Sequence, residues 1–256
     1  MKDIDDTRAP LLDHLIELRT RLIRSLLALL VTTILCYVFA EDILAVLVRP
    51  GLNAGLHKLI YTRPFDAFFV NLKVAFFAGV MCAFPVIANQ LWQFVAPGLY
   101  RKEKKALLPF LFATPVLFCA GAAMAYFVAV PAALHFLLSF QGDVGGVQRE
   151  ALPAVDAYLD FMMQFLFGFG IAFLMPILLM LLERAGIVTR KQLVGARRYA
   201  VVGNFAIALV LAPPDAGSML LLALPLCVLY ELALIGIWFT ERGRTANEAT
   251  LEAKEI

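Results

Sequence analysis

Long apolar runs alternate with short polar segments along almost the whole chain. A membrane-spanning helix needs about 20 mostly apolar residues. Six runs approach this length, so we predict an all-α polytopic membrane protein that forms a single membrane domain over residues 1–256. The predicted spans are residues 22–40, 72–94, 107–131, 158–182, 199–212 and 219–239.

The segments between the spans differ in character. The third apolar run continues to residue 140, and a straight helix of that length would exceed a bilayer core of about 30 Å. Either its three prolines, Pro109, Pro115 and Pro131, bend it, or its far end projects beyond the bilayer. The last two spans are short and are joined by a Pro-Pro-Asp turn. Residues 41–71 are interpreted as an ordered loop with short helical pieces, residues 141–156 as a polar loop, and residues 241–256 as a flexible tail.

Basic residues concentrate in alternate gaps between the runs. The N-terminal segment, the second gap, the fourth gap and the tail hold most of the lysines and arginines, and the other gaps hold few. Cytoplasmic loops carry an excess of Lys and Arg. We therefore predict that both termini face the cytoplasm. The first 21 residues are polar and of mixed charge, and no small-residue cleavage site follows the first apolar run, so we expect the first span to be an uncleaved anchor.

Composition excludes several classes of protein. The chain is 62% hydrophobic and 16% charged, whereas soluble domains are about 45–50% apolar and about 25% charged. A clustered basic face for nucleic acid is missing. Each cysteine lies inside an apolar run without metal-ligand spacing, so no disulfide or metal site is expected. These cysteines are Cys36, Cys82, Cys119 and Cys227.

Signatures of catalysis and of nucleotide binding are also missing. The chain has no GxxxxGK[ST], HExxH or GxSxG sequence, and its three histidines lie far apart. We expect neither an enzyme nor a resident cofactor.

Two acidic residues stand out on the predicted cytoplasmic side. Glu17 belongs to residues 13–22, which have the pattern of an amphipathic helix entering the first span. Glu103 is the acid among four bases in the second gap, near Trp92 and Tyr100, which suit the membrane interface. Each segment also has an alternative interpretation without a binding role. Residues 13–22 would then be an interfacial helix with a solvated charged face, and the segment around Glu103 a basic loop with one incidental carboxylate.

Both acidic segments resemble one known family. The chain reads His14-Leu15-x-Glu17-Leu18-Arg19-x-Arg21-Leu22, then Trp92-x-Phe94-x-x-Pro97-Gly98-Leu99-Tyr100-x-x-Glu103-Lys104. These strings closely resemble TatC, the receptor subunit of the twin-arginine protein translocase. Further matches are Arg63-Pro64-Phe65, Ala125-Tyr126-Phe127, Phe167-Gly168-Phe169-Gly170 and Leu211-Ala212-Pro213-Pro214-Asp215. The resemblance runs from about Leu12 to Phe239.

The resemblance implies a bacterial plasma-membrane receptor that binds twin-arginine signal peptides of folded precursors. It implies that Glu17 and Glu103 bind the arginine pair, with Arg19 orienting Glu17 and Phe94 packing on the peptide. Guanidinium groups suit this role because they bind carboxylates through two parallel hydrogen bonds. The apolar part of the peptide is expected on the concave side of a cupped bundle, with export driven by the proton-motive force. TatA, TatB, lipid and other copies of the chain are the implied partners, and nucleic acid is not.

Polar residues inside the later spans are candidates for function or partner contact. They are Gln164, Asn204, Asp215 and Glu231. Asp215 is also a candidate cap for the last helix. The resemblance implies a buried Glu at the position of Leu174, where many family members carry it; this chain departs from that pattern, and Gln164, ten residues earlier, is the candidate replacement. The alternative function is a small-solute transporter that uses Gln164 or Glu231 as an ion site, although no internal repeat supports it.

Overall fold

The computed structural model describes residues 5–56, 58–95, 104–145, 147–149, 151–184, 186–211 and 216–252. It is predominantly helical, as predicted, and its chain divides into two compact units, each of which is described by itself. The first unit comprises Met1–Leu52, His57–Pro115 and Leu152–Leu159, and the second comprises Asn53–Leu56, Val116–Ala151 and Asp160–Ile256.

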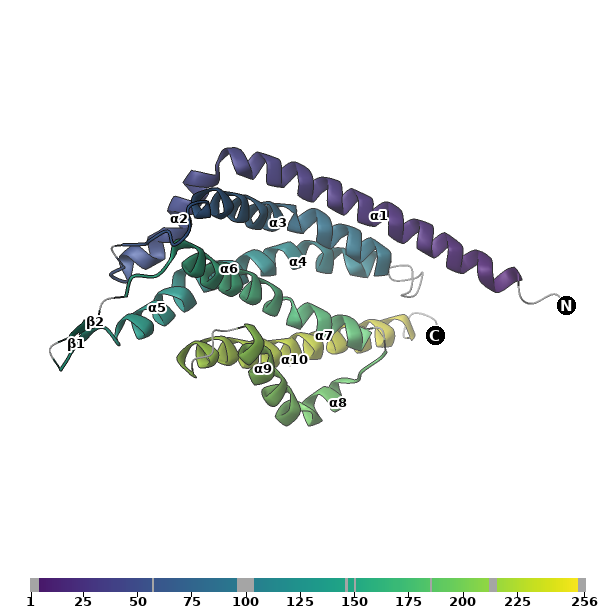
Figure 1. Ribbon diagram of the computed structural model, residues 1–256. Helices are drawn as coiled ribbons and strands as arrows, with labels where there is room; N and C mark the ends of the chain where they lie inside the picture. The colour runs from purple at the N-terminus through teal and green to yellow at the C-terminus, as the bar shows by residue number, and fades with distance from the viewer. Residues whose placement is uncertain are drawn as a thin grey trace. The chain divides into compact units, whose positions relative to one another are not determined.

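The first unit is built on the pairing of two long helices. α1 (Asp5–Val38) packs along α3 (Asp66–Val95), as Figure 1 shows. Thr32 Oγ1 of α1 donates a hydrogen bond to the carbonyl oxygen of Gly79 on α3, over 2.9 Å. A Cβ atom on Gly79 would lie 2.8 Å from the Cα of Thr33. The missing side chain therefore lets the two backbones approach closely, as small residues do between membrane helices.

Polar contacts fix the opposite end of this unit. α2 (Ala40–Asn53) follows α1, and the buried hydroxyl of Tyr158 donates to the Leu47 carbonyl (3.0 Å) and accepts from the Gly51 N–H (3.2 Å). Tyr158 lies near the start of α6 (Val155–Ala172), where Asp156 forms an ion pair with Lys73 of α3. Helix α2 and the start of α6 are thereby tied to the α1–α3 pair.

The third predicted span contains a π-helical segment just before one of its prolines. α4 (Lys104–Met124) passes into a π-helical segment, η3 (Ala125–Ala129), and then into α5 (Val130–Leu138). Pro131 lies in the first turn of α5. Proline has no N–H for the bond to the residue four positions earlier, and a π-helical turn is a common way to absorb that loss. The irregular turn of this span thus lies just before Pro131, and the bend expected from the prolines stays a prediction.

The predicted polar loop at 141–156 is partly ordered. β1 (Gly142–Val144) pairs antiparallel with β2 (Val147–Arg149), with Gly142 opposite Arg149. Gly145, at φ 64°, leads into the turn, a conformation that glycine adopts without steric cost.

The second unit contains the remaining helices. α6 ends at Ala172, and α7 (Met175–Arg184) begins one residue before Pro176, which breaks the fourth predicted span. α8 (Arg190–Gly195) and α9 (Arg197–Leu211) precede α10 (Ala216–Glu252), which packs on α7, α8 and α9. A flexible tail was expected after Thr240, but α10 continues through this segment, whose Ala, Arg and Glu residues are good helix formers.

Five helical segments are long and apolar enough to cross a membrane. They are Leu15–Val38, Asp66–Phe94, Phe110–Leu138, Val155–Arg184 and Met219–Trp238. α9 has 15 residues, about 22 Å at 1.5 Å per residue, and falls short of a bilayer core of about 30 Å. The sixth span, the cupped bundle and the cytoplasmic position of both ends therefore stay predictions.

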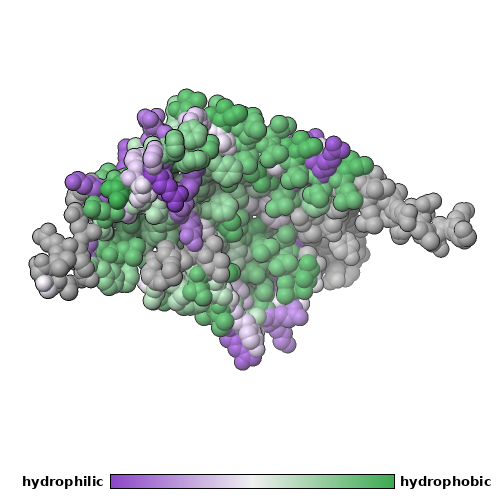
Figure 2. All heavy atoms as spheres, in the orientation of Figure 1, coloured by the Kyte–Doolittle hydropathy of each residue, from purple (hydrophilic) through white to green (hydrophobic). Residues whose placement is uncertain are grey.

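The described surface is largely apolar. Many large hydrophobic side chains are exposed on every long helix, and apolar residues cover most of the helical surface visible in Figure 2. In α1 none of the apolar window is buried. Lipid must cover such a surface, so the chain is a multi-pass membrane protein.

Candidate functional site

Glu17 lies near the start of the apolar segment Leu15–Val38 of α1, and Arg21 is its partner. Nε of Arg21 donates to Oε1 of Glu17 over 3.2 Å, and Nη2 of Arg21 forms an ion pair with the same oxygen. The two residues are four positions apart, so their side chains meet on one face of the helix. The Arg21 side chain is 17% exposed and that of Glu17 is 35% exposed. The carboxylate is therefore held in place but still open to solvent.

Arg21 also connects α1 to the end of α3. Its Nη1 donates to Oε1 of Gln93 over 3.0 Å and approaches the carbonyl oxygen of Gln90 at 3.5 Å. Gln93 in turn donates to Oδ1 of Asn89 over 2.9 Å. Because one guanidinium bridges the two helices, the position of Glu17 depends on α3 as well as on α1.

A second contact fixes this end of α3 against α4. Nε1 of Trp92 donates to Oγ1 of Thr114 over 2.8 Å, and the buried Thr114 hydroxyl donates to the carbonyl oxygen of Phe110. The Trp92 and Phe110 rings lie 6.5 Å apart, centre to centre. Contacts to α1 and to α4 thus both start from the last turns of α3, and we call the group Glu17, Arg21, Gln90, Gln93 and Trp92 the Glu17 site.

The structure revises one predicted role at this site. Arg19 was expected to orient Glu17, but Arg21 makes the contact, because positions two apart on a helix point to different faces. Arg19 is exposed on α1 and Phe94 is half-buried on α3. Glu103 lies outside the described residues, directly before Lys104, the first residue of α4. Its meeting with Glu17 stays a prediction.

A second cluster of charges lies between α8, α9 and α10. Nη2 of Arg197 donates to Oε2 of Glu231 over 2.8 Å, and both side chains are about half exposed. Glu231 was predicted as a polar residue inside the last span, and it lies within the apolar segment Met219–Trp238. Its ion pair with the first residue of α9 also places it beside the basic segment that precedes that helix.

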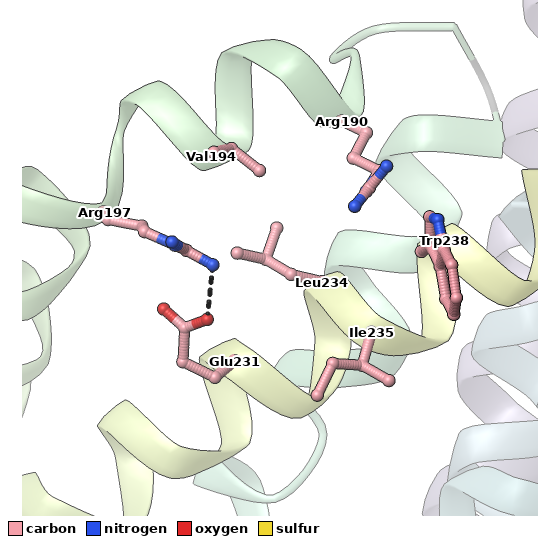
Figure 3. Close-up of a pocket in the computed structure, with 7 residues that line it drawn as sticks. All are labelled: Arg190, Val194, Arg197, Glu231, Leu234, Ile235 and Trp238. Atoms are coloured by element: carbon pink, nitrogen blue, oxygen red, sulfur yellow. Dashed lines mark hydrogen bonds and ion pairs between the residues drawn. The ribbon is translucent and has the colours of Figure 1, made fainter.

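This ion pair borders a pocket of about 270 Å³, shown in Figure 3. We call it the α8–α10 pocket, and its lining residues are Arg190, Val194, Arg197, Glu231, Leu234, Ile235 and Trp238. Arg190 and Arg197 reach toward α10 from the two ends of the α8 segment, and Trp238 stands beside Arg190. Arg190 and Arg197 therefore line the α8–α9 side of the pocket, and α10 contributes Glu231 together with apolar side chains.

Local sequence explains why α8 forms the roof of this pocket. Thr189 caps α8 by accepting the Gln192 N–H, while the Gln192 side chain accepts the Thr189 N–H, which is a complete capping box. The hydroxyl of Tyr230 donates to the carbonyl oxygen of Leu193 over 2.7 Å. Leu193, Tyr230, Leu234 and Ile237 form the buried core beneath.

The other predicted polar residues do not converge. Asn204 on α9 is 4% exposed and lies 3.7 Å from the Cys227 sulfur of α10, while Gln164 is exposed on α6. Asp215 lies outside the described residues. Leu174 lies in the break between α6 and α7. Among the described residues, the buried polar or charged side chains are Asp66, Thr114 and Asn204, and they form no common ion site.

Sequence reasoning missed Arg21, Gln90 and Gln93. The spacing of Arg21 from Glu17 was a usable signal, because opposite charges four positions apart on a helix commonly pair. The glutamines carried no comparable signal, since their role depends on how α3 is placed beside α1. Within the described residues, no group of His, Cys, Asp and Glu could hold a metal ion.

Comparison with known proteins agrees with this architecture. Residues 13–225 match the family model described as "Sec-independent protein translocase protein (TatC)". The TatC protein of Magnetococcus marinus is 43% identical over 251 residues, which are 97% of this chain and 91% of the relative. The TatC protein of Aquifex aeolicus is 40% identical over 244 residues, which are 94% of this chain and the whole of the relative.

A solved structure is similar over most of the chain. The crystal structure of the twin arginine translocase receptor TatC in DDM matches with a TM-score of 0.77 and 38% identity, and it covers 87% of this chain and 98% of that one. The family is a translocase component and a membrane receptor, not an enzyme. The chain therefore belongs to the TatC family of Sec-independent protein translocase components.

Proposed function

We propose that this chain binds the twin-arginine signal peptide of folded precursor proteins at the cytoplasmic end of α1 and α3. Glu17 and Glu103 each receive one guanidinium of the arginine pair. Membership of the TatC family supports this role, as does similarity to a solved protein described as a twin arginine translocase receptor.

The observation that carries the proposal is the contact between Glu17 and Arg21. A guanidinium already occupies one carboxylate oxygen of Glu17, so the site accepts this group in a suitable geometry. Glu17 remains 35% exposed, which leaves room for a second guanidinium from solution. The side-chain oxygen of Gln90 is buried and accepts no hydrogen bond within the described residues. This oxygen lies beside Arg21 and can accept a hydrogen bond from a guanidinium of the peptide when the side chains of the site rearrange on binding.

The neighbouring bases make recognition depend on shape. Arg19, Arg21, Lys104 and Lys105 repel a cation that approaches without a fixed geometry. A planar guanidinium that forms two charge-assisted hydrogen bonds overcomes this repulsion, and the ammonium group of lysine does not match that geometry. Phe94, next to Gln93, provides an apolar contact for the residues that follow the arginine pair.

Small single-span partners of the TatA and TatB type bind along α9 and α10, together with further copies of the chain. Both helices expose large apolar side chains, among them Val202, Leu209, Leu224 and Val228. The buried Asn204 lies between these helices. Export of the folded cargo across the plasma membrane then uses the proton-motive force.

Binding of a labelled twin-arginine signal peptide to the purified full chain tests the receptor role. Glu17→Gln and Glu103→Gln each remove one carboxylate and keep nearly the same side-chain volume. We expect each to weaken binding by about tenfold or more, because a charge-assisted pair of hydrogen bonds contributes about 1.5–3 kcal/mol.

Glu41→Gln is the matched control, because Glu41 is an exposed acid at the start of α2, away from the Glu17 site. It should bind like the parent chain. A twin-lysine peptide should bind the parent about as weakly as the twin-arginine peptide binds Glu17→Gln. Equal binding of both peptides to all variants contradicts the proposal.

A further inference from the structure

The α8–α10 pocket is not used by the proposed receptor function, and its chemistry points to a lipid. The pocket lies where α10 leaves its apolar segment, because Trp238 lies near the end of the apolar run, two residues before Thr240 and three before Glu241. Tryptophan is enriched at membrane–water interfaces, where its ring lies at the level of lipid headgroups. A ligand in this pocket therefore meets both the hydrocarbon region and the headgroup region.

Arg190 lacks a strong acceptor on its guanidinium. Its Nε–H is buried and donates no hydrogen bond within the described residues. Its Nη1 is 3.8 Å from Glu241, within ion-pair range but beyond a hydrogen bond. A buried donor without a partner costs about 1–3 kcal/mol, and a bound anion removes that cost. Nε–H and a terminal N–H of arginine together form the fork that binds phosphate oxygens.

Surrounding charges favour an anion despite two nearby acids. Arg197 keeps donor capacity beyond its bond to Glu231, because a guanidinium carries five N–H groups. Lys191 and Arg198 are exposed on the same segment. Glu231 and Glu241 are each paired with one of the two lining arginines. The basic groups of this segment outnumber these acids, so an anion is attracted to the pocket rather than repelled.

The apolar side of the pocket selects among anions. Leu234 and Ile235 form its floor on α10, and Val194 closes it from α8. Ile235 is 49% exposed, so the floor continues onto a surface that faces lipid. At about 270 Å³ the pocket lies below the usual size for a drug-sized ligand and suits a compact polar headgroup. A free phosphate would leave the apolar floor uncovered.

We propose that the α8–α10 pocket binds the headgroup of an anionic phospholipid, with its phosphate on Arg190 and its first acyl carbons on Ile235. Basic pockets between membrane helices on the cytoplasmic side are suited to acidic lipid headgroups. Bound in this way, the lipid ties the α8 segment to the last helix and to the bilayer surface. The proposal depends on the membrane location of the chain and not on its peptide-binding role.

Native mass spectrometry of the full chain in detergent tests the proposal, with phosphatidylglycerol and phosphatidylcholine titrated separately. We expect phosphatidylglycerol to bind at least about fivefold more tightly than phosphatidylcholine. Arg190→Gln should lower the affinity for phosphatidylglycerol about tenfold and leave phosphatidylcholine unchanged. Arg190→Lys keeps the charge but loses the fork, and an intermediate loss is expected.

Lys191→Gln is the matched control, because it removes the same charge one residue away and lies outside the pocket lining. It should retain the preference for phosphatidylglycerol. The melting temperature of each variant checks that the fold is intact. The proposal is overturned by equal effects of Arg190→Gln and Lys191→Gln, or by equal binding of the two lipids. Displacement of phosphatidylglycerol by millimolar inorganic phosphate would also overturn it, since the site would then be one for a soluble anion.

Discussion

Two of the glutamate–arginine pairs among the described residues differ in their structural setting. Glu17 and Arg21 lie one turn apart on α1, and α3 holds the arginine from the side. Arg197 and Glu231 lie on different helices, and both side chains are about half exposed. The first pair has 17% exposure at its arginine, a further hydrogen bond to Gln93 and a neighbouring helix contact. The second pair borders an open pocket.

The two pairs therefore have different roles. Arg21 fixes the position of the Glu17 carboxylate, whereas Arg197 and Glu231 only line the border of a pocket. Exposed ion pairs contribute about 0–1 kcal/mol, since water competes for both charges. A partly buried arginine with several acceptors contributes more, and its loss leaves those acceptors without a donor. We therefore expect substitutions at the Glu17 site to change both stability and peptide binding, and substitutions at Arg197 or Glu231 to change little in either.

The largest expected effect follows from Arg21→Gln. Glutamine cannot bridge Glu17 and Gln93 at the same time, so α1 loses a tether to α3 and Glu17 loses its fixed position. We expect a destabilisation of about 1.5–3 kcal/mol. Twin-arginine peptide binding should fall about tenfold, although the substitution removes a repulsive charge. Thermal unfolding in detergent and peptide titration measure the two effects.

Arg19→Gln is the control for that substitution, because it removes the same charge from the exposed side of α1. It should leave the melting temperature nearly unchanged. If Arg21→Gln binds the peptide more tightly than the parent chain, Arg21 is a competitor for Glu17 rather than the residue that positions it.

An intermediate effect is expected from Gly79→Ala, which tests the packing of α1 against α3 rather than the Glu17–Arg21 pair. The added methyl group would lie 2.8 Å from the Thr33 Cα, so α1 must move away from α3. Overpacking of this kind costs about 1–3 kcal/mol. Thermal unfolding should show the loss, and peptide binding should weaken with it because Glu17 is carried on α1.

Gly203→Ala is the matched control on α9, where a Cβ atom meets nothing within 4 Å. It should be neutral or slightly stabilising, since alanine favours a helix over glycine by up to about 1 kcal/mol. Equal destabilisation by the two substitutions would show that the close α1–α3 approach does not set the stability of this unit.

The smallest effect is expected at the second pair. In a double-mutant cycle, Arg197→Gln and Glu231→Gln should each change the free energy of unfolding by less than about 1 kcal/mol. Their coupling energy should also stay below about 1 kcal/mol and should shrink as salt is added, because exposed charges are screened. A coupling above about 2 kcal/mol would mean that this pair is as firmly held as the one on α1.

The sequence predicted the elements better than their contacts. Apolar run length located the long helices, and the irregular turn of the third span lies beside Pro131, because proline cannot donate the bond that continues a helix. The short hairpin at 142–149 and the helical continuation to Glu252 were missed, since local propensity in polar segments is weak. For the segment after Thr240, the pattern of charges did not distinguish a disordered tail from a charged helix.

At the Glu17 site and the α8–α10 pocket, the sequence identified candidate residues but not the side chains that they contact. Glu17 was identified as a candidate from its motif, but the choice of Arg19 over Arg21 ignored helical spacing. The partner of Glu231 could not be predicted, because it depends on the register between α9 and α10, which the apolar pattern of either helix leaves open. In the sequence Arg190 is one of several basic residues in its segment, and only the position of α8 over α10 shows that it lines a pocket.

Site-specific photocrosslinking is the most direct test of the central claim, that Glu17 and Glu103 together hold the arginine pair of a signal peptide. A photoreactive residue at position 17 or at position 103 of the full chain is exposed to a precursor in its native membrane. We expect both positions to crosslink to residues beside the arginine pair, and a twin-lysine precursor to crosslink at neither. Crosslinking from one position alone, or equal crosslinking of both precursors, would contradict the account.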